Sequence, residues 1–194
     1  MVDDSDELLV AKAKAGSKEA FSKLVERYYE MVYGLAYGIL NRREPALDVA
    51  QDVFLKVFHD LDKYEGRSKF KTWLYRVSVN AAIDHQRRIR YADSIDLTDT
   101  SDGDDRAPLI IVDLKQDPLG SAVQSEMRVH IEKALNQLSL DQRMILTLRE
   151  WQGLSYEEIA ETLQIEAGTV MSRLFYARKR LAEVLGVQYK KEIL

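Results

Sequence analysis

The 194-residue sequence contains no cysteine, which excludes a disulfide, a thiol nucleophile and a thiolate metal site. No apolar run approaches the roughly 18 residues that a membrane-spanning helix needs. The first residues, Met1–Glu7, are acidic, which argues against a signal peptide. These absences predict a cytoplasmic chain without membrane insertion.

Sequence motifs of common enzyme classes are also missing. There is no Walker loop, no Gly-rich strand-to-helix turn and no H-E-x-x-H sequence. His59 and Asp60 form an HD dipeptide, but metal-dependent phosphohydrolases of that kind need another histidine upstream, and none precedes His59. We therefore predict that the chain is not an enzyme and expect no cofactor and no metal.

The net charge of −4 is unevenly distributed. Residues 66–90 carry seven lysines and arginines against the single acid Asp84, and residues 173–191 form a second basic island. Residues 91–125 between them carry eight aspartates against Arg106 and Lys115. Local charge matters more than total charge for contact with a polyanion. The pattern favours nucleic-acid contact by the two islands.

Helical spacing of apolar residues runs through most of the chain. We expect helices from Ser5 to Ala15, after a Ser17 cap, from near Pro45 and after a Ser68 cap. Four more are expected after Pro118. The predicted fold is all-α, with one helical domain at 1–92, an acidic flexible linker at 93–117 and a second helical domain at 118–194.

The last two predicted helices form a helix-turn-helix. Ser155 and Glu158 make a capping box at the start of the first helix. Val170, Leu174 and Ala177 give the second helix a buried stripe. Arg173, Arg178, Lys179 and Arg180 lie off that stripe, so we expect water or phosphate to receive them. Such a pair reads DNA in the major groove, although an ordinary helical hairpin with a solvated basic face fits the pattern too.

Four sequence blocks follow one another over nearly the whole chain. They are Asp48–Lys56, Phe70–Asn80, Leu138–Arg143, and Gly153–Ala160 followed by Gly168–Val170 and Ser172–Arg173. In content and order these blocks resemble the extracytoplasmic-function sigma factors, bacterial initiation factors with two helical domains called regions two and four. The resemblance implies a protein that binds core RNA polymerase, at its β′ clamp and β flap, and directs it to promoter DNA.

The resemblance implies three sets of contact residues. The polymerase-binding set is Asp48, Gln51, Asp52 and Lys56, which share one helix face, expected opposite the Phe54, Phe58 and Leu61 side. The −10 set is Lys63, Tyr64, Arg67, Lys69, Arg76, Asn80, Arg87 and Arg88, while Trp73 is expected to pack in the core. The −35 set is Thr169, Met171, Ser172, Arg173, Phe175, Tyr176, Arg178 and Lys179.

Two positions depart from the family pattern. Members often carry arginine where this chain has Met171 and Tyr176, so a familiar −35 consensus cannot be transferred. The resemblance also implies control by an anti-sigma factor. The acidic linker is expected either to mimic nucleic acid in a basic polymerase channel or to act only as a tether. Replacing Asp102, Asp104 and Asp105 with asparagine separates these two readings.

Two rival functions are weaker. A conventional helix-turn-helix regulator would bind duplex DNA unaided, but it would not need the Asp48–Lys56 and Phe70–Asn80 blocks. A decoy that sequesters an anti-sigma factor would not need the basic face at 173–180. An ordinary solvated face on the third helix is the plain alternative to polymerase docking.

Overall fold

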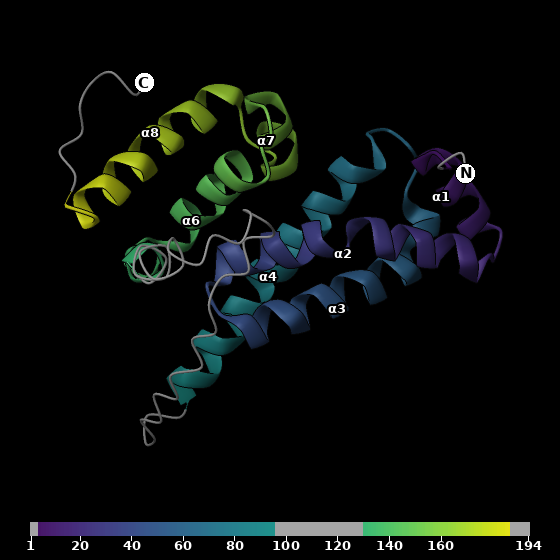
Figure 1. Cartoon of the computed structure of the whole chain (residues 1–194), viewed down its shortest axis with the longest axis horizontal. Coiled ribbons are helices and arrows are strands. Elements are labelled where there is room, and N and C mark those ends of the chain that lie inside the picture. Colours follow the sequence, from purple (N-terminus) through teal and green to yellow (C-terminus); the bar gives the residue numbers. More distant parts are fainter. Residues whose placement is uncertain (1–3, 96–129, 187–194) are drawn as a thin grey trace, which may run out of the picture.

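The computed structural model of the chain describes residues 4–95 and 130–186, and within these ranges every regular element is helical (Figure 1). The first part contains α1 (Asp6–Lys14), α2 (Lys18–Leu40), α3 (Arg43–Asp60), the short 3-10 helix η1 (Leu61–Lys63) and α4 (Phe70–Ile95). The second contains helical residues 130–136, α6 (Leu140–Leu146), the π-helix η2 (Thr147–Trp151), α7 (Tyr156–Leu163) and α8 (Ala167–Val184). The all-α prediction is confirmed. Apart from the last residues of α4, the expected linker lies outside the described residues.

Serine side chains cap the starts of four helices. The side chains of Ser5 and Ser17 accept backbone N–H groups in the first turns of α1 and α2. Complete capping boxes begin α6 at Ser139 and α7 at Ser155. These contacts satisfy backbone donors that a helix start would leave unpaired.

The expected cap of α4 at Ser68 is wrong by one residue. The carbonyl of Lys69 accepts from the backbone N–H of Trp73, so the cap position falls on Lys69. The Ser68 carbonyl instead accepts the hydroxyl of Tyr64 at 2.6 Å. Because the loop uses Ser68 to hold Tyr64, the helix begins later than the serine suggests.

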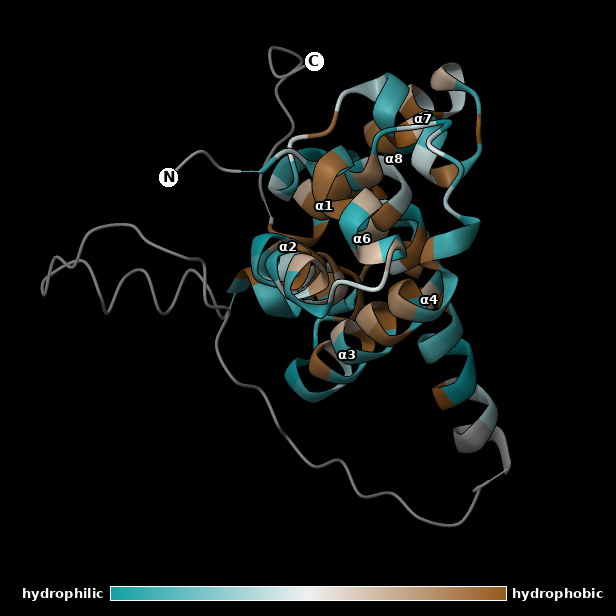
Figure 2. Ribbon diagram, turned by 90° about the vertical axis from the view of Figure 1, so that its right-hand side faces the viewer, coloured by the Kyte–Doolittle hydropathy of each residue, from teal (hydrophilic) through white to brown (hydrophobic). Residues whose placement is uncertain are grey.

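The helices turn their apolar faces toward one another, and polar residues cover the outside (Figure 2). Val32, Leu74 and Val53 are fully buried where α2, α4 and α3 meet. In the second part, Ile145, Ile159 and Leu174 play the same role for α6, α7 and α8. The buried side chains of the two parts form one continuous cluster. This joint core places α2 and α4 against α6, η2 and α7.

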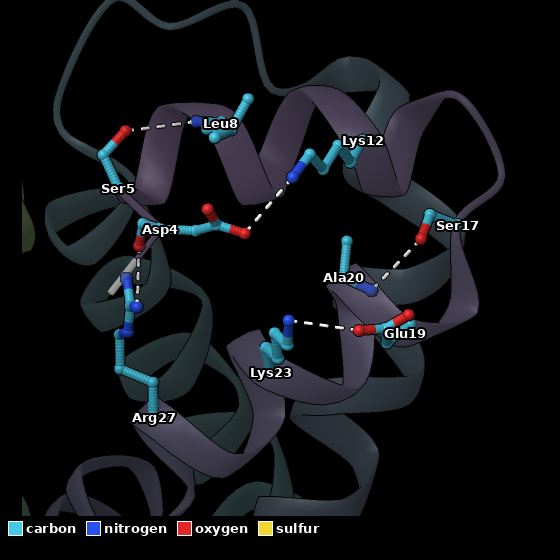
Figure 3. Close-up of polar contacts among 9 residues, drawn as sticks. All are labelled: Asp4, Ser5, Leu8, Lys12, Ser17, Glu19, Ala20, Lys23 and Arg27. Carbon is cyan, nitrogen blue, oxygen red and sulfur yellow. Dashed lines mark hydrogen bonds and ion pairs between the residues drawn. The ribbon is translucent and has the colours of Figure 1, made fainter. Parts of the chain in front are cut away.

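Charged contacts fasten α1 across the start of α2 (Figure 3). Arg27 donates to the backbone carbonyl of Asp4 at 2.8 Å, and Asp4 pairs with Lys12 at 3.2 Å. Arg27 also pairs with the carboxylate of Asp6 at 2.6 Å, and the Tyr28 hydroxyl donates to the other oxygen of Asp6. Burial and this hydrogen bond raise the pKa of Tyr28 well above that of a free tyrosine. The hydroxyl is therefore a proton donor to Asp6 at neutral pH.

Replacing Tyr28 with phenylalanine tests whether its hydrogen bond to Asp6 holds α1 against α2. We expect Tyr28→Phe to lower the free energy of unfolding by about 1–3 kcal/mol, because it removes a hydrogen bond to a charged group and keeps the ring. Hydrogen exchange in α1 should accelerate more than in α3. Tyr29→Phe is the matched control, because Tyr29 is partly exposed and contributes its ring to a stack on Phe54. Equal effects of the two substitutions would contradict the assignment.

Candidate nucleic-acid interface

One face of α3 is exposed along its length. Asp48, Gln51, Asp52 and Leu55 follow one another at helical spacing, and all are exposed. Leu55 is 60% exposed, which is unusual for a large apolar side chain beside buried helix neighbours. Lys56 flanks this face and is also exposed. The face thus combines two carboxylates and an amide with an apolar centre.

The expectation that Phe58 lies on the opposite, buried side of α3 is wrong. Phe54 and Leu61 are buried as expected, but Phe58 is 53% exposed. It follows Leu55 by three residues, so helical geometry returns it to the exposed face. Its ring meets Phe21 edge-on at 5.1 Å between ring centroids. Phe58 therefore extends the apolar centre that Leu55 begins.

The loop between η1 and α4 is organised around Tyr64. The Lys14 ammonium of α1 donates to the Tyr64 carbonyl and lies 5.7 Å from the centroid of its ring. The ring packs against Trp73 at 5.3 Å and against Phe70 at 5.7 Å. Together with the hydroxyl bond to Ser68, these contacts hold both ends of the loop. Trp73 is half-buried against the core, as expected.

A cavity of about 570 Å³ lies between α1 and this loop. Its lining includes Tyr64, Arg67 and Lys69 from the loop, with Glu7 and Lys14 from α1. The volume is typical of a small-ligand pocket, and the polar groups that line it carry both signs of charge.

The exposed face of α4 is a separate surface. Arg76, Asn80 and Arg87 follow one another at i, i+4 and i+11, which aligns them on one side of the helix. Asn80 is exposed and Arg76 is half-buried. Asn80 lies ten residues beyond Phe70, so about 15 Å of helix separates it from the cavity. The structure therefore divides the predicted −10 set into a cavity group and a helix-face group.

Most cations of this set have acidic neighbours. Lys63 pairs with Asp60 at 2.6 Å, Arg67 with Glu65 at 2.5 Å, Arg87 with Asp84 at 3.8 Å and Arg88 with Asp52 at 3.6 Å. Every one of these cations is well exposed, so the pairs contribute little to stability and a phosphate can replace the carboxylate. Within residues 4–95 and 130–186, Lys69 and Arg76 form no ion pair.

The second helix pair has the geometry of a helix-turn-helix. The connector turns at Gln164, whose φ of 55° lies in the left-handed region. Val170, Leu174 and Ala177 are buried, and α8 turns its opposite face to solvent. On that face Ser172 donates to the Thr169 carbonyl at 3.0 Å.

The exposed face of α8 is partly aromatic. Arg173 is exposed, and Met171 and Tyr176 are 57% and 63% exposed. Phe175 meets Tyr176 edge-on with 5.4 Å between ring centroids. The cations expected here by family pattern are thus replaced by a thioether and a phenol. This face offers apolar contacts next to the Arg173 guanidinium.

The expectation that water or phosphate receives every cation of α8 is wrong for Arg178 and Arg180. Arg178 donates twice to the carboxylate of Glu150 in η2, at 2.6 and 3.0 Å, and Arg180 donates to Glu183 at 3.4 Å. Burial alone would lower the pKa of Arg178, but Glu150 more than offsets it, and the pKa is raised. Arg178 thus connects α8 to η2, while Lys179 is exposed.

Sequence reasoning missed the contributions of Glu7, Lys14 and Glu150. Lys14 contacts a residue 50 positions away, and Glu150 contacts one 28 positions away. Helical spacing predicts only which residues of one helix share a face, so it cannot pair two helices. No short motif marks these residues.

Within residues 4–95 and 130–186, no cluster of three or more His, Asp or Glu side chains is suited to a metal ion. No helix in these ranges is both long and apolar enough to span a bilayer.

Family comparisons agree with this geometry. Residues 24–91 match Sigma-70 region 2, and residues 128–181 match Sigma-70, region 4. The chain is 35% identical over 187 residues to the RNA polymerase sigma-H factor of Pseudomonas aeruginosa, covering 95% of this chain and 96% of that relative. It is 36% identical over 180 residues to the ECF RNA polymerase sigma-E factor of Haemophilus influenzae, covering 91% and 93%. The chain belongs to the extracytoplasmic-function sigma factors.

Solved structures give a consistent result for this sigma factor. It superposes on the sigma factor RpoE of Bartonella quintana, solved with the anti-sigma factor NepR, with a TM-score of 0.67 and 26% identity. That match covers 88% of this chain and 99% of RpoE. CnrH, solved with the cytosolic domain of CnrY, has the same TM-score at 23% identity over 94% and 98% of the two chains, and shows the shared fold. As a sigma factor, the protein directs RNA polymerase to its promoters.

Proposed function

We propose that this sigma factor docks on core RNA polymerase through α3, reads the −10 element with α4 and the loop before it, and reads the −35 element with α8. One observation carries the assignment: a single chain places an exposed docking helix, a cavity with an adjoining basic helix face, and a helix-turn-helix on separate surfaces. A conventional regulator needs only the last of these. The chemistry belongs to the polymerase, and the factor itself is not an enzyme.

The α3 face supports docking on the β′ clamp through a mixed surface. Asp48, Gln51 and Asp52 supply hydrogen-bond acceptors, and Leu55 with Phe58 supplies apolar area. Interfaces draw most of their energy from a few central apolar or aromatic side chains surrounded by polar groups. Leu55 and Phe58 occupy that central position, and the polar residues set orientation.

Leu55→Ala tests the docking face. We expect core polymerase affinity to fall by about tenfold, corresponding to about 1.4 kcal/mol, with little change in thermal stability because Leu55 is 60% exposed. Fluorescence anisotropy of labelled sigma factor against core enzyme measures the affinity. Leu8→Ala on α1 is the matched control, since Leu8 is also an exposed leucine on a helix (44%). Indistinguishable affinities for the two variants would exclude the α3 face.

The −10 reader works on separated strands, so it must hold an extruded base and the backbone beside it. The cavity beside Tyr64 is the proposed base subsite, with Arg67 and Lys69 facing the adjoining phosphates. Arg76 and Arg87 then follow the backbone along α4, and Asn80 between them offers both donors and an acceptor to a base edge. Lys63 and Arg88 flank these subsites.

The −35 reader is the exposed face of α8 in the major groove. Arg173 is suited to a guanine edge or a phosphate, and the methyl and ring surfaces of Met171, Phe175 and Tyr176 are suited to thymine methyl groups. Thr169, Ser172 and Lys179 border this surface. Arg178 contributes mainly by fixing α8 to Glu150. This composition predicts weaker salt dependence than an arginine-rich helix would give.

Run-off transcription with bacterial core polymerase tests both readers. We expect the wild-type protein to produce defined start sites on promoter fragments from its own genome. Asn80→Ala and Arg173→Ala should each reduce transcript by at least about tenfold, because a good bidentate base contact is worth about 1–3 kcal/mol. A protein that shifts duplex DNA alone and yields no transcript with core enzyme would instead be a conventional regulator.

Lys14 is proposed to position the −10 loop from α1. Lys14→Gln removes the cation that holds the Tyr64 carbonyl and ring, so selectivity among −10 base substitutions should fall by about threefold to tenfold, with −35 selectivity unchanged. Lys14→Arg should restore most of the loss. Lys18→Gln, an exposed lysine at the start of α2, is the control. A parallel loss at both elements would indicate a general folding effect.

Regulation by an anti-sigma factor is part of the proposal. It is supported by the relatedness to RpoE, which was solved with the anti-sigma factor NepR. A cytoplasmic location follows from the role, because polymerase and promoter are there. Nearly all of the linker lies outside the described residues. Its role, as a tether or as a mimic of nucleic acid, therefore stays a prediction.

A further inference from the structure

The exposed face of α8 has two flanks of different chemistry. On one flank Met171 and Phe175 lie one helical turn apart, and on the other Thr169 and Arg173 do so. Tyr176 lies between the flanks and meets Phe175 edge-on, with 5.4 Å between ring centroids. Met171, Phe175 and Tyr176 are 57%, 36% and 63% exposed. These three side chains form an apolar row beside the Arg173 guanidinium.

Few hydrogen-bond donors accompany the apolar row. The Ser172 hydroxyl donates to the Thr169 carbonyl at 3.0 Å, so its proton is already used within the helix. The Met171 thioether and the Phe175 ring have no donor to offer to a base edge. Hydrogen bonding by these turns therefore depends mainly on Arg173 and on the hydroxyls of Thr169 and Tyr176. The apolar row can contribute only through contact area.

The charge around the apolar row favours DNA over a protein surface. Helix α8 carries four basic residues and one acid, Glu183, which lies in its last turn. No acid lies in its first turn. A positively charged helix complements a polyanion, and large exposed apolar side chains on it mark a contact surface. The best complement to such a face is a DNA groove that itself contains apolar groups.

The major groove presents one apolar group, the C5-methyl of thymine. Cytosine lacks this group, but 5-methylcytosine carries a methyl at the same ring position. The two methylated pyrimidines differ in the neighbouring group, which is an oxygen acceptor in thymine and an amino donor in cytosine. Met171 and Phe175 have no strong donor or acceptor with which to distinguish these neighbours. They can therefore detect the methyl of either base.

We propose that the apolar row reads the 5-methyl groups of pyrimidines in the −35 duplex, so that methylation of a contacted cytosine raises the affinity of the sigma factor for its promoter. This inference rests on the proposed role of α8 as the −35 reader. Each methyl that leaves water for the row adds about one methylene equivalent of apolar burial, which corresponds to an affinity ratio of about threefold to fivefold. Binding then responds to the methylation state of the promoter.

Base substitutions that change only the methyl test this readout. The probe is a promoter fragment on which the holoenzyme, assembled from the wild-type chain and core polymerase, makes a defined start. Deoxyuridine replaces each thymine of the −35 element in turn, which removes the methyl and keeps the base pairing. Competition binding of the holoenzyme measures the affinity for each fragment. At one or more positions we expect deoxyuridine to weaken binding by about threefold to fivefold.

A second comparison at the same position separates the methyl from the rest of thymine. The base pair is changed to C·G, once with cytosine and once with 5-methylcytosine. We expect the 5-methylcytosine fragment to bind about threefold to fivefold more tightly than the cytosine fragment, because the row regains its methyl. Equal binding of these two fragments would restrict the readout to thymine and overturn the proposed response to cytosine methylation.

Variants of the chain assign the effect to the apolar row. Combining Met171→Ala with Tyr176→Ala should bring the thymine-to-deoxyuridine affinity ratio close to one, and alanine at both exposed positions suits the helix. Met171→Leu should keep the ratio, since leucine preserves the apolar contact. Trp151→Ala should also keep it and is the matched control, because Trp151 is 39% exposed on η2, outside α8.

Equal affinities for thymine and deoxyuridine at every −35 position would overturn the methyl readout, and so would a ratio that survives the combined alanine variant. Arg173→Ala distinguishes this failure from a failure of the proposed function. If Arg173→Ala weakens binding to every fragment while thymine and deoxyuridine bind equally, only the methyl readout is wrong. If Arg173→Ala has no effect either, α8 does not read the −35 element, and both proposals are wrong.

Discussion

The complete burial of the last six residues of α2 is the constraint on which this structure depends. The consecutive residues from Leu35 to Leu40 are all buried. A helix can bury consecutive residues only when neighbours cover it on every side. The α3 and α4 helices cover one side, and α6 with η2 covers the other. The first domain therefore presents an apolar surface that it cannot bury by itself, and the second domain supplies the cover.

Helix starts could be predicted from the sequence because the capping contacts that fix them join residues only a few positions apart. The Ser17 cap of α2 and the capping box at Ser155 each depend on neighbours in sequence. Phe58 was expected on the buried side of α3 because its side chain is apolar. Helical spacing, however, places it on the same exposed face as Gln51 and Leu55.

Contacts between distant segments were beyond sequence reasoning. Nothing in the sequence around Asn41 indicates that it meets Asn136, and nothing around Lys14 indicates Tyr64. The family resemblance supplied the order of the docking and reading surfaces, yet it treated the −10 residues as one set. The length of α4 separates them into a cavity and a helix face, which is a property of three-dimensional structure.

Helix α1 lies before the residues that match region 2, yet it lines the cavity beside the loop that precedes α4. The region 2 match begins at residue 24, whereas α1 ends at Lys14. Glu7 and Lys14 nevertheless form one wall of the cavity beside the loop. Two factors with identical residues from 24 onward can therefore differ in the shape and charge of that cavity. A protein trimmed to the matched residues would lose α1, which supplies four of the eleven residues that line this cavity.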